Sequence, residues 1–196
     1  MNRKATILRT TKETDITVEI ALDGTGLVHS NCGVPFLDHM FASFGMHGCF
    51  DLTVECKGDT DVDDHHSTED LGICFGRAVD EALEEKLGIN RFGDATIPMD
   101  ESLVRVIIDL SGRSFLNFDA SLLEGRWTGL FETGLVKEFF QAVTQSGKMT
   151  VHIDILHGRS PHHIVEAMFK AFGRALKEAV TVDGKKSILP STKGLL

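Results

Sequence analysis

The sequence predicts an α+β fold built by internal duplication, in which two similar halves each form a mixed β-sheet with helices packed on one face. Three observations lead to this prediction. A short motif occurs twice at a fixed spacing, each copy begins a long helical segment, and both halves show the same order of strands and helices. The halves are predicted to be residues 1–93 and 94–196, and the second half ends in a polar tail.

The repeated motif is a pair of histidines followed by a glutamate. His65-His66-Ser67-Thr68-Glu69 is matched by His162-His163-Ile164-Val165-Glu166, and 162 − 65 = 97. The match continues at the same spacing, with Phe75-Gly76-Arg77-Ala78 matched by Phe172-Gly173-Arg174-Ala175. Two such clusters on two copies of one helix indicate a two-metal site that arose by duplication.

The first half is predicted to contain three strands, a short helix and a long helix. Residues with alternating or apolar strand patterns lie at 6–10, 16–22 and 50–57, and helices are expected at 35–44 and 65–87. Pro35 suits the first turn of the short helix, and Gly88 is expected to stop the long one.

The second half repeats this order. Strands are expected at 103–110 and 114–120, paired with each other, and at 149–156. Helices are expected at 132–145 and 161–180, with the second ending near Gly184.

Composition narrows the class of protein. The chain has 196 residues and 42% hydrophobic residues, which is enough for a core. Its 29 acidic residues outnumber the 20 basic ones, which argues against a general nucleic-acid binder. No segment is long and apolar enough for a signal peptide or a membrane span, and the four cysteines form no C-x-x-C pair. A cytoplasmic protein with reduced thiols is therefore expected.

Helical geometry predicts that the two histidines of each pair bind different ions. Residues advance about 100° per step, so His65 and Glu69 share a face, while His66 lies about 60° from Glu69 on its other side. The same holds for His162, His163 and Glu166. Each histidine of a pair is thus expected to bind a different metal, with the glutamate joining one of them.

Further ligands are expected from equivalent places in the repeat. His39 lies 26 residues before His65 (65 − 39 = 26), and Glu138 lies 24 residues before His162 (162 − 138 = 24), each on the preceding helix. Imidazole and carboxylate ligands without thiolate favour manganese, iron or zinc. The acidic loop at 58–64 is expected to be solvated and to lie near the cation site.

Long motifs in this order resemble the imidazoleglycerol-phosphate dehydratase family over nearly the whole chain. They are Phe36-Leu37-Asp38-His39-Met40, Asp64-His65-His66-Ser67-Thr68-Glu69-Asp70, His162-His163-Ile164-Val165-Glu166-Ala167 and Pro190-Ser191-Thr192-Lys193-Gly194. The resemblance implies dehydration of imidazole glycerol phosphate to imidazole acetol phosphate in histidine biosynthesis. It also implies two manganese ions per active site and a homo-oligomer of 24 subunits with sites where subunits meet.

The resemblance also assigns residues to the site. The implied metal ligands are His39, His65, His66, Glu69, Glu138, His162, His163 and Glu166, although many members have histidine where this chain has Glu138. The implied substrate-binding residues are Glu13, His39, His47, Arg91, Arg113, Lys170, Ser191 and Lys193, several of them for the phosphate. Glu13, His65 and His163 are the implied catalytic residues.

Loss of water beside an imidazole requires the ring to push electrons, which coordination of a ring nitrogen favours. Glu13 is predicted to move the proton of the neighbouring carbon, a role that suits a carboxylate. Two other functions remain open. A dinuclear metallohydrolase would release inorganic phosphate, and a metal-storage protein would need no basic residues such as Arg91, Arg113 and Lys193.

Overall fold

The computed structural model describes residues 3–182 and 188–196 and places two β-sheets on the outside of a double layer of helices. The first sheet and its helices are β1 (Lys4–Thr10), β2 (Thr14–Ala21), β3 (Val28–Asn31), α1 (Pro35–Gly48), β4 (Asp51–Gly58) and α2 (His65–Leu83). The second sheet and its helices are β5 (Phe92–Met99), β6 (Ser102–Asp109), β7 (Phe115–Phe118), α3 (Leu135–Ser146), β10 (Thr150–His157) and α4 (Pro161–Val180). A small hairpin, β8 (Trp127–Thr128) and β9 (Phe131–Glu132), projects from one end.

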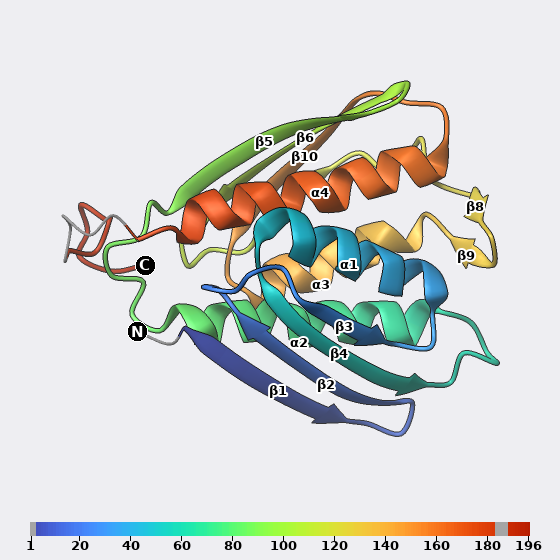
Figure 1. Ribbon diagram of the computed structural model, residues 1–196, viewed down its shortest axis with the longest axis horizontal. Coiled ribbons are helices and arrows are strands. Elements are labelled where there is room, and N and C mark those ends of the chain that lie inside the picture. Colours follow the sequence, from blue (N-terminus) through green and yellow to red (C-terminus); the bar gives the residue numbers. More distant parts are fainter. Residues whose placement is uncertain (1–2, 183–187) are drawn as a thin grey trace.

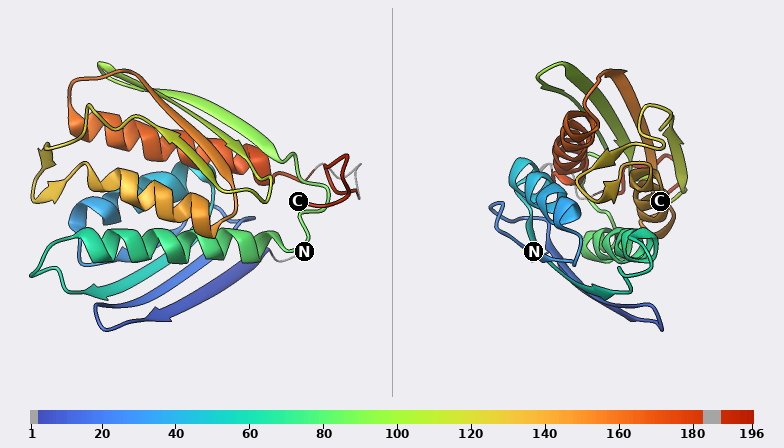
Figure 2. Two further views of the ribbon diagram at one scale, coloured as in Figure 1. Left: turned by 180° about the vertical axis from the view of Figure 1, so that it is seen from behind. Right: turned by 90° about the vertical axis from the view of Figure 1, so that its right-hand side faces the viewer.

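The two sheets have the same topology, which confirms the predicted duplication. The strand orders are β1-β2-β4-β3 and β5-β6-β10-β7. In each sheet the first three strands in space are antiparallel and the last is parallel to its neighbour. Each sheet therefore presents one face to the helices and the other to the surface, as Figure 2 shows from two further sides.

Alternation of side chains along the strands explains why one face is covered. In β2, Ile16, Val18 and Ile20 are buried while their neighbours are more exposed, and β6 buries Val104, Val106 and Ile108 in the same way. In the helix layer α1 packs against α4 and α2 packs against α3. Phenylalanines fill the space between the helices, with Phe44 and Phe172 5.6 Å apart and Phe75 and Phe139 6.1 Å apart between ring centroids.

Glycine allows the closest of these helix contacts. A Cβ at Gly173 of α4 would lie 2.5 Å from the Phe44 carbonyl oxygen of α1. A Cβ at Gly76 of α2 would lie 2.5 Å from the Val143 carbonyl oxygen of α3. Gly76 and Gly173 belong to the repeated Phe-Gly-Arg-Ala segment, so the repeat preserves the contact that brings each pair of helices together.

Two of the predicted strand arrangements were wrong or incomplete. The expected pairing of 103–110 with 114–120 does not occur, because β10 lies between β6 and β7 and pairs with both. The central strand β6 pairs with β5 on one side and β10 on the other. The sequence prediction omitted β3, which has only four residues, and β5, whose Pro98 is tolerated because the strand is at the sheet edge.

The helix ends differ in detail from the prediction. The predicted helix at 132–145 begins at Leu135, because Glu132 belongs to the β8–β9 hairpin. The helix predicted to reach residue 87 ends at Leu83, where Glu84 has a φ of 49°. The helix α4 has its predicted bounds, although Gly184, its expected stop signal, lies outside the described residues. The strand β5 starts at Phe92, two residues before the predicted start of the second half.

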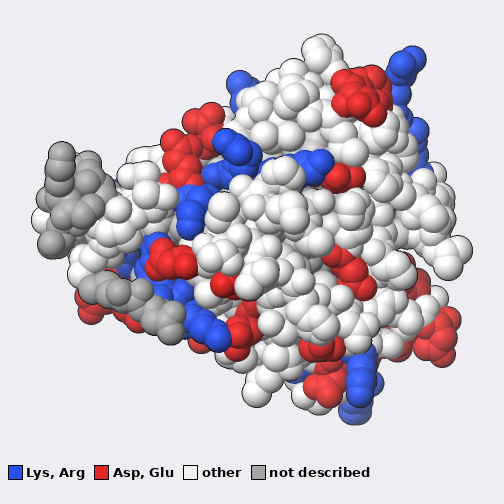
Figure 3. Space-filling model, in the orientation of Figure 1, with Lys and Arg blue, Asp and Glu red and all other residues white. Residues whose placement is uncertain are grey.

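No helix in the described part of the chain is long and apolar enough to cross a membrane. Acidic and basic side chains are interspersed over the face drawn in Figure 3, as expected for a chain with both charges in quantity.

Candidate metal centre

The histidine pairs lie at the N-terminal ends of α2 and α4, at the same end of the helix layer. A cleft of about 780 Å³ opens there. Its lining includes His39, His65 and His162 together with Trp127, Leu130 and Phe131 of the hairpin region. The two copies of the repeated motif therefore border one cleft within a single chain.

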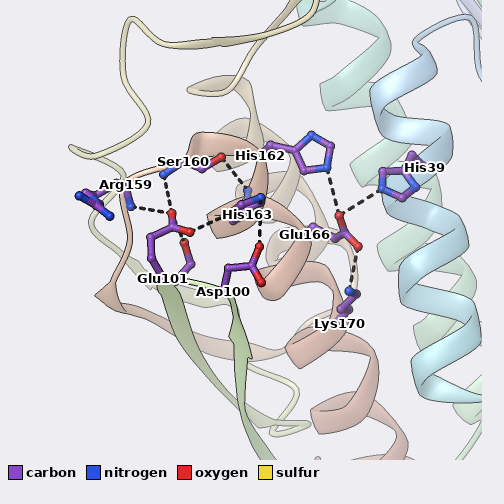
Figure 4. A network of polar contacts seen from close by, with 10 residues as sticks. His39, Asp100, Glu101, Arg159, Ser160, His162, His163, Glu166 and Lys170 are labelled. Carbon is purple, nitrogen blue, oxygen red and sulfur yellow. Dashed lines mark hydrogen bonds and ion pairs between the residues drawn. The ribbon is translucent and has the colours of Figure 1, made fainter.

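His39, His162 and Glu166 converge on one point (Figure 4). One ligand atom from each lies within 4.8 Å of the others. The Nε2 atoms of His39 and His162 lie 3.2 and 3.1 Å from the same Glu166 carboxylate oxygen. His39 comes from α1 and the other two from α4, so the contact between these helices assembles the cluster.

Lys170 supports Glu166 from the other side, with its Nζ 2.8 Å from the second carboxylate oxygen. Burial opposes the charged form of Glu166, but the hydrogen bonds and charges of Lys170 and His39 outweigh it and lower the pKa of this carboxyl. Glu166 is therefore an anion at neutral pH, and it is buried at 7% exposure. A buried carboxylate beside two imidazoles is a suitable set of ligands for a divalent cation.

Adjacent histidines point in different directions, as helical geometry predicts. The rings of His65 and His66 are 6.2 Å apart at 89°, and those of His162 and His163 are 6.1 Å apart at 87°. The first histidine of each pair faces the glutamate of its own motif, although His65 is 3.8 Å from Glu69. The second histidine of each pair turns toward a carboxylate elsewhere in the chain.

These carboxylates are Asp59 and Glu101. The Nδ1 atom of His66 lies 3.0 Å from Asp59, and that of His163 lies 2.7 Å from Glu101. The hydrogen bond that each imidazole donates to its carboxylate is the main cause that raises the pKa of each histidine above 6.5. Neither carboxylate was predicted as a site residue, although the acidic loop that contains Asp59 was expected to lie near the cation.

The first-half cluster is more open than its second-half counterpart. Glu138 lies in the first turn of α3, which packs against α2, just as His39 lies on α1 against α4. Its half-buried side chain makes no hydrogen bond within the described residues. The first-half counterparts of His162, Glu166 and His39 are thus His65, Glu69 and Glu138. Their ligand atoms do not come as close together as those of the second-half cluster.

Comparisons with known proteins agree with this geometry. The family model described as imidazoleglycerol-phosphate dehydratase matches residues 32–176. The chain belongs to the imidazoleglycerol-phosphate dehydratase family. The predicted family is thereby confirmed, and with it the predicted class of enzyme, a hydro-lyase of histidine biosynthesis.

Individual relatives match nearly end to end. The dehydratase of Lachnoclostridium phytofermentans is 54% identical over 99% of this chain and 98% of its own length. That of Desulfotalea psychrophila is 51% identical over 100% of this chain and 97% of its own length. The crystal structure of the Staphylococcus aureus dehydratase superimposes with a TM-score of 0.82 at 42% identity, covering 92% of this chain and 99% of the other. The Pyrococcus furiosus enzyme in complex with (S)-C348 gives 0.83 at 38% identity, covering 97% and 100%.

The acid–base residue expected in this dehydratase, Glu13, lies in the turn between β1 and β2. Its backbone is held in place, because its N–H donates to the Thr11 hydroxyl and its carbonyl accepts from the Asp59 N–H. The next residue, Thr14, donates a 2.6 Å hydrogen bond to Asp70, which lies beside Glu69 on α2. The Glu13 side chain is exposed and makes no hydrogen bond within the described residues.

His39 is itself part of the second-half cluster, and two further predicted substrate residues lie near it. Lys170 contacts Glu166 directly. His47, in the last turn of α1, has its pKa lowered by burial and by the charges of Lys170 and Arg174.

The remaining predicted substrate contacts lie at the opposite end of the helix layer. The Arg91 N–H donates to the carbonyl of Ala179 near the end of α4. Since 179 − 163 = 16, Ala179 is about 24 Å along the helix axis from His163. The Arg91 side chain pairs with Asp109 and donates to the carbonyl of Pro190, which holds the tail carrying Ser191 and Lys193 at this end. Arg113 follows the end of β6, where Asp109 pairs with Phe92, the neighbour of Arg91. One chain by itself therefore does not bring the metal-ligand residues and these basic residues together.

Proposed function

We propose that this protein is a manganese-dependent dehydratase that converts imidazole glycerol phosphate to imidazole acetol phosphate and water in histidine biosynthesis. The observation that carries the proposal is the convergence of His39, His162 and Glu166 in a member of this family. Four free cysteines suit the reducing cytoplasm, the location that we propose.

The donor set fits manganese. We assign one ion to the converged cluster His39, His162 and Glu166 and the other to its repeat counterpart, His65, Glu69 and Glu138. The second histidines, His66 and His163, complete the ligands. In each pair the two histidines face different carboxylates, so we assign the second histidine to an ion other than the one that its neighbour would bind.

Bound manganese would supply Lewis-acid polarisation of the imidazole ring of the substrate. The chain supplies the proton transfer. The Glu13 side chain is exposed, while hydrogen bonds to Thr11 and Asp59 fix its backbone, so its carboxylate is available as the group that takes the proton from the carbon next to the departing hydroxyl.

The separation of residues within one chain supports an oligomer. Arg91, which bonds to Ala179 and holds the tail, lies about 24 Å along α4 from His163, too far to bind the phosphate of the same small substrate. We therefore propose that a second subunit brings its basic end to the cleft, in a homo-oligomer of 24 subunits, the number that the family resemblance implies. The exposed Trp127 and Leu130 beside the cleft suit contact with another subunit.

Turnover of metal-free protein tests the proposal. Imidazole glycerol phosphate is supplied with and without Mn²⁺, and the acetol phosphate and inorganic phosphate are both measured. Mn²⁺-dependent formation of the acetol phosphate is expected, whereas phosphate release without it would instead identify a metallohydrolase. A Glu13→Gln variant should bind Mn²⁺ as the wild type does while kcat falls by a factor of about 100 or more, the usual contribution of a general acid–base group. Full turnover in that variant would remove Glu13 from the chemistry.

A further inference from the structure

The turn that carries Glu13 has a counterpart in the second half of the chain. Strands β1 and β5 start 88 residues apart (92 − 4 = 88), as do β2 and β6 (102 − 14 = 88). The same spacing relates Glu13 to Glu101, since 101 − 13 = 88. The two glutamates are therefore equivalent residues in the two hairpins.

Their side chains are held in very different ways. One carboxylate oxygen of Glu101, Oε1, accepts hydrogen bonds from the backbone N–H of Ser160 at 2.7 Å and of Arg159 at 3.2 Å, at the start of α4. It also accepts from the Ser102 hydroxyl at 3.1 Å. The other oxygen, Oε2, lies 2.7 Å from Nδ1 of His163 (Figure 4). Glu13 has no such contacts in the described part of the chain.

This arrangement determines which ring nitrogen of His163 carries a proton. The backbone donors occupy Oε1, so Oε2 is fixed opposite Nδ1. An ionised carboxylate can only accept, and Nδ1 must therefore carry the hydrogen. In the neutral ring Nε2 then has the lone pair, and its nearest carboxylate oxygen, on Asp100, is 3.8 Å away, beyond hydrogen-bonding distance.

We infer that Glu101 is a positioning residue that fixes His163 in the tautomer whose Nε2 can bind a metal ion. The inference rests on the proposed manganese site. A carboxylate on the second nitrogen of a metal-binding histidine commonly orients the ring, and its loss typically lowers metal affinity about 10- to 100-fold. The two repeat-equivalent glutamates thus have separate roles, Glu101 in orienting a ligand and Glu13 in proton transfer.

The first half of the chain offers a matched control. Asp59 contacts Nδ1 of His66 through both oxygens, at 3.0 and 3.3 Å, and neither oxygen accepts from another group within the described residues. An amide at position 59 can therefore rotate to present its oxygen to Nδ1. An amide at position 101 cannot do so, because its oxygen is needed by the Ser160 and Arg159 N–H groups.

The test compares Glu101→Gln and Asp59→Asn in the full-length protein, with Mn²⁺ as the probe and free Mn²⁺ counted by electron paramagnetic resonance. In Glu101→Gln the amide NH₂ faces Nδ1 and favours the tautomer with the proton on Nε2. Binding of one of the two ions should weaken about 10- to 100-fold, whereas Asp59→Asn should lose less than about tenfold. The thermal unfolding temperature of the metal-free variants should match that of the wild type. The side-chain oxygen at position 101 still accepts from the backbone N–H groups of Arg159 and Ser160 in Glu101→Gln.

The outcomes separate the inference from the proposed function. Wild-type protein that binds no Mn²⁺ would overturn both. Wild-type binding with equal affinity in Glu101→Gln would overturn the positioning role alone. Lower stability of metal-free Glu101→Gln than of Asp59→Asn would also overturn it, because the carboxylate would then act mainly by holding the start of α4.

Discussion

Replacing Gly173 with alanine tests whether the contact between α1 and α4 assembles the second-half cluster. A Cβ at this position would lie 2.5 Å from the carbonyl oxygen of Phe44 and 3.3 Å from the backbone nitrogen of Gly48. Both atoms belong to the backbone of α1, so no side chain can rotate to make room. The two helices must therefore separate, or α1 must shift along α4.

The change in the free energy of unfolding of Gly173→Ala is the sum of two opposing effects. Overpacking of a core typically costs about 1–3 kcal/mol, and the backbone contacts here favour the upper value. Alanine is a better helix former than glycine by about 1 kcal/mol, which offsets part of this cost. A net loss of about 2 kcal/mol in the free energy of unfolding is expected, or a fall in Tm of about 4–8 °C for a chain of this size.

Urea unfolding of the metal-free protein measures the stability, and Mn²⁺ titration measures the site. Affinity should fall together with stability, because His39 lies on α1 whereas His162 and Glu166 lie on α4. Arg174→Ala, on the exposed side of the same helix, serves as the control and should change stability by less than about 0.5 kcal/mol. A Gly173→Ala protein that is as stable as the wild type and binds Mn²⁺ equally would refute the reasoning.

Three further predictions concern charged groups. Asp70→Ala should lower the free energy of unfolding by about 3 kcal/mol in urea titrations, because Arg9, with 30% of its side chain exposed, loses a carboxylate at 2.8 Å; a loss below 1 kcal/mol would contradict this. Backbone N–H groups of residues 25–27 lower the pKa of Asp51. This carboxylate therefore stabilises the fold at any pH above its unfolded pKa of about 3.9. The stabilisation is lost as the pH falls through the lower pKa of the folded state. The stability difference between wild type and Asp51→Ala should therefore shrink below about pH 4, and a difference that grows there would be inconsistent with the hydrogen bonds. Finally, the pKa values of His66 and His163 are raised, so Mn²⁺ must displace protons and its affinity should increase between about pH 6 and 8; calorimetry that shows no proton release would exclude this.

The sequence determined the features that depend on local pattern and on the repeat. The spacing of 97 between the two His-His-x-x-Glu motifs indicated the duplication and two ion sites. Helical periodicity correctly indicated that neighbouring histidines point apart, and Pro161 and the apolar pattern gave the bounds of α4. These properties follow from residues within a few turns of one another, so no knowledge of distant contacts was needed.

Which distant segments contact one another depends on tertiary packing and could not be predicted from the sequence. Strand β10 separates β6 from β7, although the sequence places the latter two next to each other. The β8–β9 segment at residues 119–134 replaces the short connection at 32–34 of the first half, so the spacing of the repeat increases from 88 at β1 and β5 to 99 at β4 and β10 (150 − 51 = 99). It is 97 between the two His-His-x-x-Glu motifs. The spacing of 97 between the motifs does not relate Glu101 to Glu13. No local pattern indicates the contact of Glu101 with His163, because the two residues are 62 positions apart. Periodicity in sequence reports which face of an element is apolar, whereas the partner of that face is selected by packing between elements that are far apart along the chain.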